Sequence, residues 1–394
     1  MTPFQGTKLW TRDFILLCVS NFLMFTAFYL LIPTLPVYLV QTFHANKTQV
    51  GIVLAAYTLA AMIIRPFTGI AIDSYGRKWI FLFGMGIFAL LFNVYILALS
   101  VFFIVCLRFV HGLLWGITTT AANTAVVDLI PAKRRGEGIG IFGLSFTVAM
   151  AIGPFLGIII SNNEHYTTMF FIGFLMVLAG FLLAMNIRFP EYLHARKPSV
   201  TLANLIETTS IPVSINLLII NITYGGIISF IALYGREIGV PNPGLFFLVY
   251  AAGISLTRFF AGKILDKFGP HIPMTAGMLL MAAGFPVLAL LKTDFGFLLS
   301  AALMGLGGGV VMPTFQTMVN NMVAAQKRGA ANSTLFTSLD LGIGIGMVLI
   351  GFLSEKFSLT VSFLICAGII LCGIVFFLSY VQRHYDKHKL NIIH

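Results

Sequence analysis

The feature that most constrains this sequence is a series of long apolar runs separated by short polar breaks. Each run has about 20 or more residues, which is enough to cross the hydrocarbon layer of a membrane as an α-helix. Because lipid offers no partners to backbone N–H and C=O groups, and a barrel would need short alternating segments, the runs predict helices. The predicted fold class is an all-α membrane protein with twelve transmembrane helices, at residues 14–40, 47–72, 79–98, 100–129, 137–160, 167–187, 211–235, 243–265, 272–291, 295–322, 329–353 and 358–381.

The composition excludes several classes of protein. Only 9% of the 394 residues are charged, whereas soluble proteins carry about 25%, so a soluble enzyme, a nucleic-acid-binding domain and a secreted disulfide scaffold are excluded. The four cysteines lie inside apolar runs, where free cysteine packs as a small hydrophobe: Cys18, Cys106, Cys366 and Cys372. We therefore expect no disulfide, no metal site and no cofactor.

The positive charges are distributed unevenly between the two sides of the predicted helices. Of the 24 Lys and Arg residues, 17 fall in the breaks and tails of one side, and only Lys47, Arg236, Lys292 and Lys356 fall on the other. Cytoplasmic loops carry an excess of Lys and Arg. We therefore expect a multi-pass protein of the cytoplasmic (inner) membrane with both termini in the cytoplasm, and the net charge of +11 has no nucleic-acid meaning.

The second half of the sequence repeats the first at an offset of 193 residues. The residues that share this offset without a gap are Arg65 and Arg258, Gly69 and Gly262, Asp73 and Asp266, Gly76 and Gly269, Gly112 and Gly305, Gly116 and Gly309, Arg135 and Arg328, Gly136 and Gly329, and Gly153 and Gly346. We predict two pseudo-symmetric six-helix bundles, 1–187 and 211–394, joined by a cytoplasmic linker at 188–210. A transporter built this way binds its substrate between the halves and rocks one against the other.

The break after the second run carries a recognisable motif, Gly69-x-x-x-Asp73-x-x-Gly76-Arg77-Lys78. It resembles the loop signature of the major facilitator superfamily, and the resemblance covers essentially the whole chain. In that family the loop stabilises the outward-facing state, which implies a conformational latch. The latch residues are Gly69, Asp73, Gly76, Arg77 and Lys78, with Asp128 as a charge partner and Arg258, Gly262, Asp266 and Gly269 as the second copy, which lacks the two basic residues.

A charged residue lies within the fourth apolar run. Arg108 begins the pattern Arg108-x-x-x-Gly112, with His111 almost one turn away. A charge inside a membrane helix costs at least about 2.5–3.5 kcal/mol and usually faces a cavity or a partner. The pattern is similar to a helix 4 motif of the family, which implies a role in proton coupling. The alternatives are a snorkelling arginine and a histidine that only packs.

The fifth run is rich in small residues and contains a proline. Gly140, Ala149, Gly153, Pro154 and Gly157 resemble the antiporter motif of drug:proton exporters, with Ala149 in place of the middle glycine. Proline favours a bend. The resemblance implies export, and the alternative is ordinary small-residue packing between helices.

Asp340 lies about 12 residues into the eleventh run, close to 18 Å deep at the helix rise of 1.5 Å per residue. A carboxylate at that depth can carry a proton, so Asp340 joins Arg108 and His111 as a candidate coupling residue; the alternative is a structural aspartate.

Pro33 and Pro36 are expected to break the end of the first run. The candidates for lining a substrate cavity are the polar residues Asn21, Tyr29, Tyr57, Asn123, Asn216, Asn221, Tyr224 and Gln316.

These observations predict a transporter and not an enzyme. We expect a monomeric secondary active transporter that exports small amphipathic or drug-like compounds in exchange for protons by alternating access. Its partners are the small-molecule substrate, protons and membrane lipids. The alternatives are an exporter or proton symporter of sugars or other polar metabolites, a passive facilitator, and a membrane sensor that has lost transport.

The predicted topology can be tested by cysteine labelling. In a chain whose native cysteines are replaced by alanine, Lys197→Cys is expected to resist a membrane-impermeant thiol reagent added to intact cells, because the linker is cytoplasmic. Lys356→Cys, on the opposite side, is the positive control. Labelling of Lys197→Cys from outside would show that the orientation is wrong.

Overall fold

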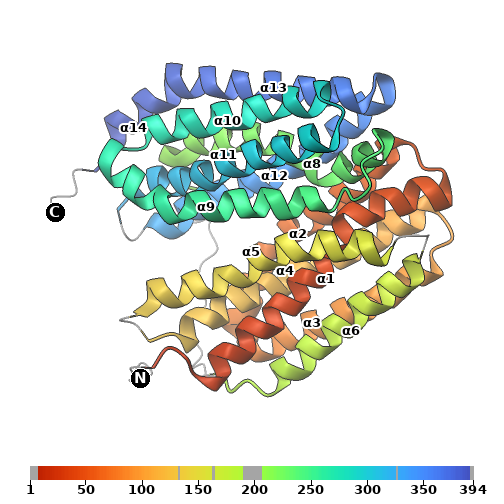
Figure 1. The fold of residues 1–394 in the computed structure, drawn as a ribbon. Helices are drawn as coiled ribbons and strands as arrows, with labels where there is room; N and C mark the ends of the chain where they lie inside the picture. The colour runs from red at the N-terminus through yellow and green to blue at the C-terminus, as the bar shows by residue number, and fades with distance from the viewer. Residues whose placement is uncertain (1–7, 132–133, 162–164, 190–205, 325–326, 391–394) are drawn as a thin grey trace. The chain divides into compact units, whose positions relative to one another are not determined.

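The computed structural model describes residues 8–131, 134–161, 165–189, 206–324 and 327–390, and these residues form helices and turns with no β-strand (Figure 1). The first helices are α1 (Arg12–Phe43), α2 (Lys47–Tyr75), α3 (Arg77–Val94), η1 (Tyr95–Leu97), α4 (Val101–Leu129), α5 (Arg135–Ile160) and α6 (Tyr166–Met185). They are followed by η4 (Thr208–Ser210), α8 (Ile211–Glu237), α9 (Leu245–Phe268), α10 (His271–Leu290), α11 (Asp294–Asn321), α12 (Arg328–Lys356), α13 (Leu359–Phe376), η6 (Phe377–Val381) and α14 (Gln382–His388).

The described residues include 11 helices long and apolar enough to cross a membrane, together with a shorter apolar stretch at Leu245–Arg258 in α9. The all-helical membrane fold is therefore as predicted. One local expectation is wrong: α1 continues through Pro33 and Pro36 to Phe43. Proline is tolerated inside transmembrane helices because neighbouring helices and side chains satisfy the freed carbonyls.

The chain divides into two compact units. Unit 1 contains residues 1–45 and 56–198, and unit 2 contains residues 46–55 and 199–394. In unit 1, α1 packs against α5 and α6, and α3 packs against α4 and α6. In unit 2, α8 packs against α12 and α13, while α10 lies between α11 and α13 and α11 contacts α9.

Close backbone contacts recur in the two units at the same offset of 193 residues. A Cβ atom on Gly112 of α4 would overlap the carbonyl oxygen of Tyr57 on α2, and one on Gly305 of α11 would overlap that of Tyr250 on α9. Small residues permit such backbone-to-backbone packing of membrane helices. The repeat in the sequence therefore corresponds to a repeated helix contact inside each unit.

The helix ends repeat in the same way. The Ser100 hydroxyl caps α4 by accepting from the Phe103 N–H at 3.2 Å, and the Thr293 hydroxyl caps α11 by accepting from the Gly296 N–H at 3.1 Å. The turns before α3 and α10 contain Gly76 at φ 82° and Gly269 at φ 67°, a region that favours glycine. These turns set where the two loops reverse direction.

The surface carries many large apolar side chains that water would not favour, among them Leu99 at 89% and Phe102 at 76% exposure. Such a surface fits the hydrocarbon region of a bilayer. Cys106 and Cys372 also lie on this surface, so the expectation that they pack inside the protein is wrong for these two.

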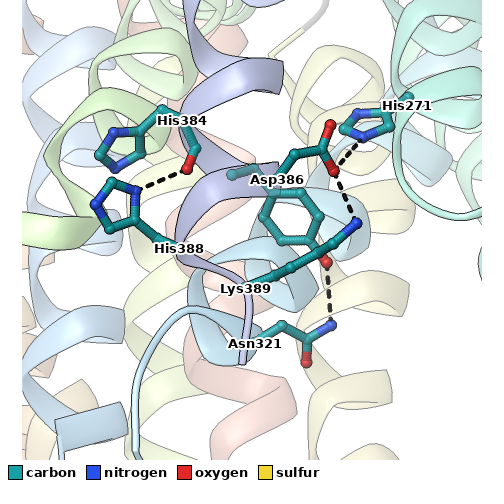
Figure 2. Close-up of polar contacts among 7 residues, drawn as sticks. His271, Asn321, His384, Asp386, His388 and Lys389 are labelled. Atoms are coloured by element: carbon teal, nitrogen blue, oxygen red, sulfur yellow. Dashed lines mark hydrogen bonds and ion pairs between the residues drawn. The ribbon is translucent and has the colours of Figure 1, made fainter. Parts of the chain in front are cut away.

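The C-terminal helix is held to unit 2 by polar contacts, which Figure 2 shows. Asp386 accepts from Lys389 Nζ at 2.9 Å and lies 3.1 Å from His271 Nε2 of α10. Asn321 of α11 donates to the Tyr385 hydroxyl at 3.4 Å, and the His384 carbonyl lies 2.8 Å from His388 Nδ1. The contacts with His271 and Asn321 fasten α14 to the ends of α10 and α11, and the other two lie within the C-terminal segment.

The helix contact at Gly112 can be tested by adding one methyl group. Gly112→Ala is expected to lower the thermal unfolding midpoint of the purified protein in detergent, because overpacking costs roughly 1–3 kcal/mol. Gly143→Ala is the matched control, since a Cβ at Gly143 would meet no described atom within 4 Å. Equal midpoints for the two variants would contradict the contact.

Candidate functional site

An aromatic shell from four helices of unit 1 surrounds the candidate site. The ring of Phe28 on α1 stacks on Trp115 of α4 with 4.1 Å between centroids and on Tyr57 of α2 at 5.1 Å. Phe88 of α3 lies 4.0 Å from the His111 ring of α4. The shell excludes water from the side chains that it encloses.

Arg108 lies inside this shell and is only 2% exposed. Its guanidinium carbon is 4.0 Å from the centre of the Tyr57 ring, the geometry of a cation–π contact. The Tyr95 side chain is a further neighbour of the guanidinium. Nε and Nη1 have no hydrogen-bond partner in the part of the chain that the structure describes. The alternative of snorkelling does not fit this degree of burial.

His111 is fully buried beside Arg108. The Tyr95 hydroxyl lies 3.1 Å from His111 Nδ1. The hydroxyl carries a single proton, and the tautomer of His111 sets which of the two groups donates. His111 Nε2 is buried without a hydrogen-bond partner among the described residues. The contact between the Tyr95 hydroxyl and Nδ1 joins His111 of α4 to Tyr95 of η1, which follows α3.

The structure describes the side chains of some of the predicted latch residues and not of others. Arg77 at the start of α3 forms an ion pair with Asp128 at the end of α4, and Lys78 follows it in α3. A Cβ on Gly69 would meet no described atom within 4 Å, so close helix approach does not explain that glycine here. In the second copy Arg258 is exposed and Gly269 makes the turn described above. The side-chain positions of Asp73, Gly262 and Asp266 lie outside the described residues.

The small residues of α5 pack against α1. Ala149 is buried, a Cβ on Gly153 would lie 2.8 Å from the Thr26 carbonyl oxygen, and one on Gly157 would overlap the Leu30 carbonyl. Pro154 lies inside the helix without ending it, and Gly140 lies outside the described side chains. Gly346 of α12 makes the equivalent approach to Ile222 of α8, so the packing itself does not require the proline.

Asp340 is half-buried near the middle of α12, on the helix that packs against α8 in unit 2.

The candidates for lining a substrate cavity have different surroundings from one another. Asn21 donates to Ser145, Asn216 to the Gly373 carbonyl, Asn221 to Leu217 and Asn123 to Thr119, while Tyr29 and Tyr57 are buried, Tyr224 stacks on Tyr250, and Gln316 is exposed. The bonds of Asn21 and Asn216 join helices, which is a structural use of these residues.

Two features were missed from the sequence. Tyr95 looks like one more aromatic residue in an apolar run, but its counterpart at the 193-residue offset is Leu288, a difference that could have revealed it. Lys47 does more than set topology: its Nζ lies 2.8 Å from Glu237 and its backbone N–H donates to the Glu355 carboxylate at 2.8 Å, all within unit 2.

Comparison with known proteins matches the chain to one family of membrane transporters. The model of the Major Facilitator Superfamily matches residues 17–249 and 213–392. Multidrug resistance protein MdtG of Escherichia coli O1:K1 / APEC is 27% identical over 395 residues, covering 95% of each chain. The staphylopine export protein of Staphylococcus aureus (strain Mu50 / ATCC 700699) is 23% identical over 360 residues, covering 86% of this chain and 88% of its own. Among solved structures, a mutant of nucleoside transporter NupG has a TM-score of 0.80 at 15% identity, covering 93% of this chain and 99% of its own, which shows the fold.

The Arg77–Asp128 ion pair can be tested by a double-mutant cycle. Arg77→Gln and Asp128→Asn are each expected to destabilise the protein, and the double variant by less than the sum, with a coupling of about 1 kcal/mol at most for a partly exposed pair. Unfolding in mixed micelles measures it. Arg77→Gln combined with Asp294→Asn of unit 2 is the control for additivity; additive effects in the Arg77–Asp128 pair would contradict the interaction.

Proposed function

We propose a function for this chain from one premise, which is that it belongs to the Major Facilitator Superfamily. It is a multi-pass membrane transporter of small molecules and not an enzyme. We propose that it exports small amphipathic or drug-like compounds in exchange for protons. The proposed architecture is twelve helices in two pseudo-symmetric halves, 1–187 and 211–394, joined by the linker 188–210, of which residues 190–205 lie outside the described part.

The observation that carries the proposal is the burial of Arg108 among helices of a membrane protein. A charge in such a place is costly, and intramembrane charges mark substrate and proton pathways. Export is supported by the relatives, one named for multidrug resistance and one for export, each similar over most of its length. The small residues and Pro154 of α5 also support export, because they resemble the antiporter motif of drug:proton exporters.

In the proposed cycle Asp340 exchanges its proton as the substrate leaves, and Arg108 and His111 adjust the coupling. Burial disfavours the ionised form of a carboxylate, so a carboxylate in a membrane helix can carry a proton and release it when its surroundings change. The ion gradient is the proposed energy source, since the sequence contains no G-x-x-x-x-G-K-S/T loop that would cradle nucleotide phosphates.

The proposed latch consists of the two loop motifs around Gly76 and Gly269. The Arg77–Asp128 ion pair supports it, because it ties the start of α3 to the end of α4. A bistable element of this kind lets one ligand shift the population of two conformations. We further propose that the protein is a monomer in the inner membrane with both termini in the cytoplasm.

The coupling role of Asp340 can be tested in proteoliposomes. Asp340→Asn is expected to abolish uphill transport driven by a pH gradient while substrate exchange is retained, because the amide cannot release a proton. Asp294→Asn, which removes a carboxylate from the first turn of α11, is the control and should transport as the unmodified protein does. Unchanged uphill transport by Asp340→Asn would refute the assignment, and counterflow of labelled sugars in place of dyes would favour the polar-metabolite alternative.

A further inference from the structure

The surroundings of Arg108 are not a requirement of the shared helix packing. At the offset of 193 residues, Arg108, Tyr95 and His111 correspond to Ala301, Leu288 and Met304. Ala301 and Leu288 are fully buried, and the contact between Gly305 and Tyr250 is made without any charge. The second half therefore builds the same contact from apolar residues. A polar group that packing does not need calls for another explanation.

Hydrogen-bond donors around Arg108 outnumber the acceptors available to them. The guanidinium has five N–H donors and no acceptor, and its Nε and Nη1 atoms are buried without a partner among the described residues. The Tyr57 hydroxyl, beside it, is also buried without one. Leaving such groups unsatisfied is expensive, most of all for a charge. The missing complement is an acceptor.

The local charge is positive. The carboxylates among the described side chains of unit 1 are Asp13 and Asp128. Asp128 is 20 residues from Arg108 along α4, or roughly 30 Å, and Asp13 is 15 residues from Phe28 along α1, or about 22 Å. Arg108 forms no ion pair with any described residue. Among the described side chains of unit 1, a bound anion would therefore meet no carboxylate that competes with it for Arg108.

We propose that Arg108 and the Tyr57 hydroxyl bind an oxyanion group, a carboxylate, sulfonate or phosphate, of the transported molecule. Arg is suited to such groups because its N–H donors match their oxygens. Phe28 and Trp115 of the shell contact the apolar part of the same molecule. This proposal rests on the proposed function, since it takes the occupant to be the cargo, and it narrows the cargo to amphipathic anions.

The test is a comparison of two probes that differ in charge and hardly in shape. Naphthalene-2-sulfonate is an anion and naphthalene-2-sulfonamide is neutral at pH 7. Equilibrium dialysis against the purified full-length protein is expected to show the sulfonate bound at least about tenfold more tightly, as charge-assisted hydrogen bonds allow. Equal affinities for the two probes would overturn the proposal without any variant being needed.

Variants assign the preference to the residues named. Arg108→Gln is expected to remove the preference for the sulfonate, Arg108→Lys to retain part of it, and Tyr57→Phe to weaken sulfonate binding several-fold while the ring contact remains. Tyr250→Phe is the matched control, because it removes the corresponding hydroxyl in the half that has Ala301, and it should bind as the unmodified protein does. A preference that survives Arg108→Gln would overturn the proposal, and circular dichroism checks that each variant is folded.

The binding test is independent of transport. It uses no membrane gradient, so selective sulfonate binding that depends on Arg108 supports the site even if pH-driven transport is absent. In the converse case, pH-driven dye export with no preference for the sulfonate overturns the site and leaves the proposed function standing.

Discussion

The lipid environment imposes the constraint on which this structure depends, because every polar group within the helices must find its partner inside the protein. The backbone meets this demand by forming helices. Most polar side chains meet it too: Thr118 donates to the Leu114 carbonyl of its own helix, and Ser20 and Asn216 donate to carbonyls of neighbouring helices. Other buried polar atoms also lack a partner among the described residues, but Arg108 is a charged group whose Nε and Nη1 both lack one, and that needs a functional explanation.

The glycines make the packing possible. Gly112 and Gly305 bring paired helices to backbone contact, and Gly153 and Gly346 do so for the helices α5 and α12 against α1 and α8. The close contact of α4 with α2 is also what lays Tyr57 across the Arg108 guanidinium. The same small residues therefore pack the fold and position the polar site.

Much of the fold could be predicted from the sequence, since apolar runs of spanning length leave the chain few choices in lipid. The end of α1 could not, because the effect of Pro33 and Pro36 depends on the helices around them. In the candidate site, Arg108 could be predicted from the cost of charge in a membrane, and His111 from its position almost one turn away on the same helix. Tyr95 was not, because its role depends on how α3 and α4 pack and its sequence context is uniformly apolar.

The proposed function depends on two kinds of observation, the family membership and the individual residues. The family membership establishes a transporter, whereas the direction of transport, the coupling ion and the cargo depend on residues such as Asp340 and Arg108. The most direct measurement is uptake of ethidium and naphthalene-2-sulfonate into proteoliposomes with an imposed pH gradient. Proton-coupled transport predicts that the gradient drives accumulation of at least one of them and that a protonophore abolishes it. Absence of uptake, or equal uptake with and without the gradient, would contradict it.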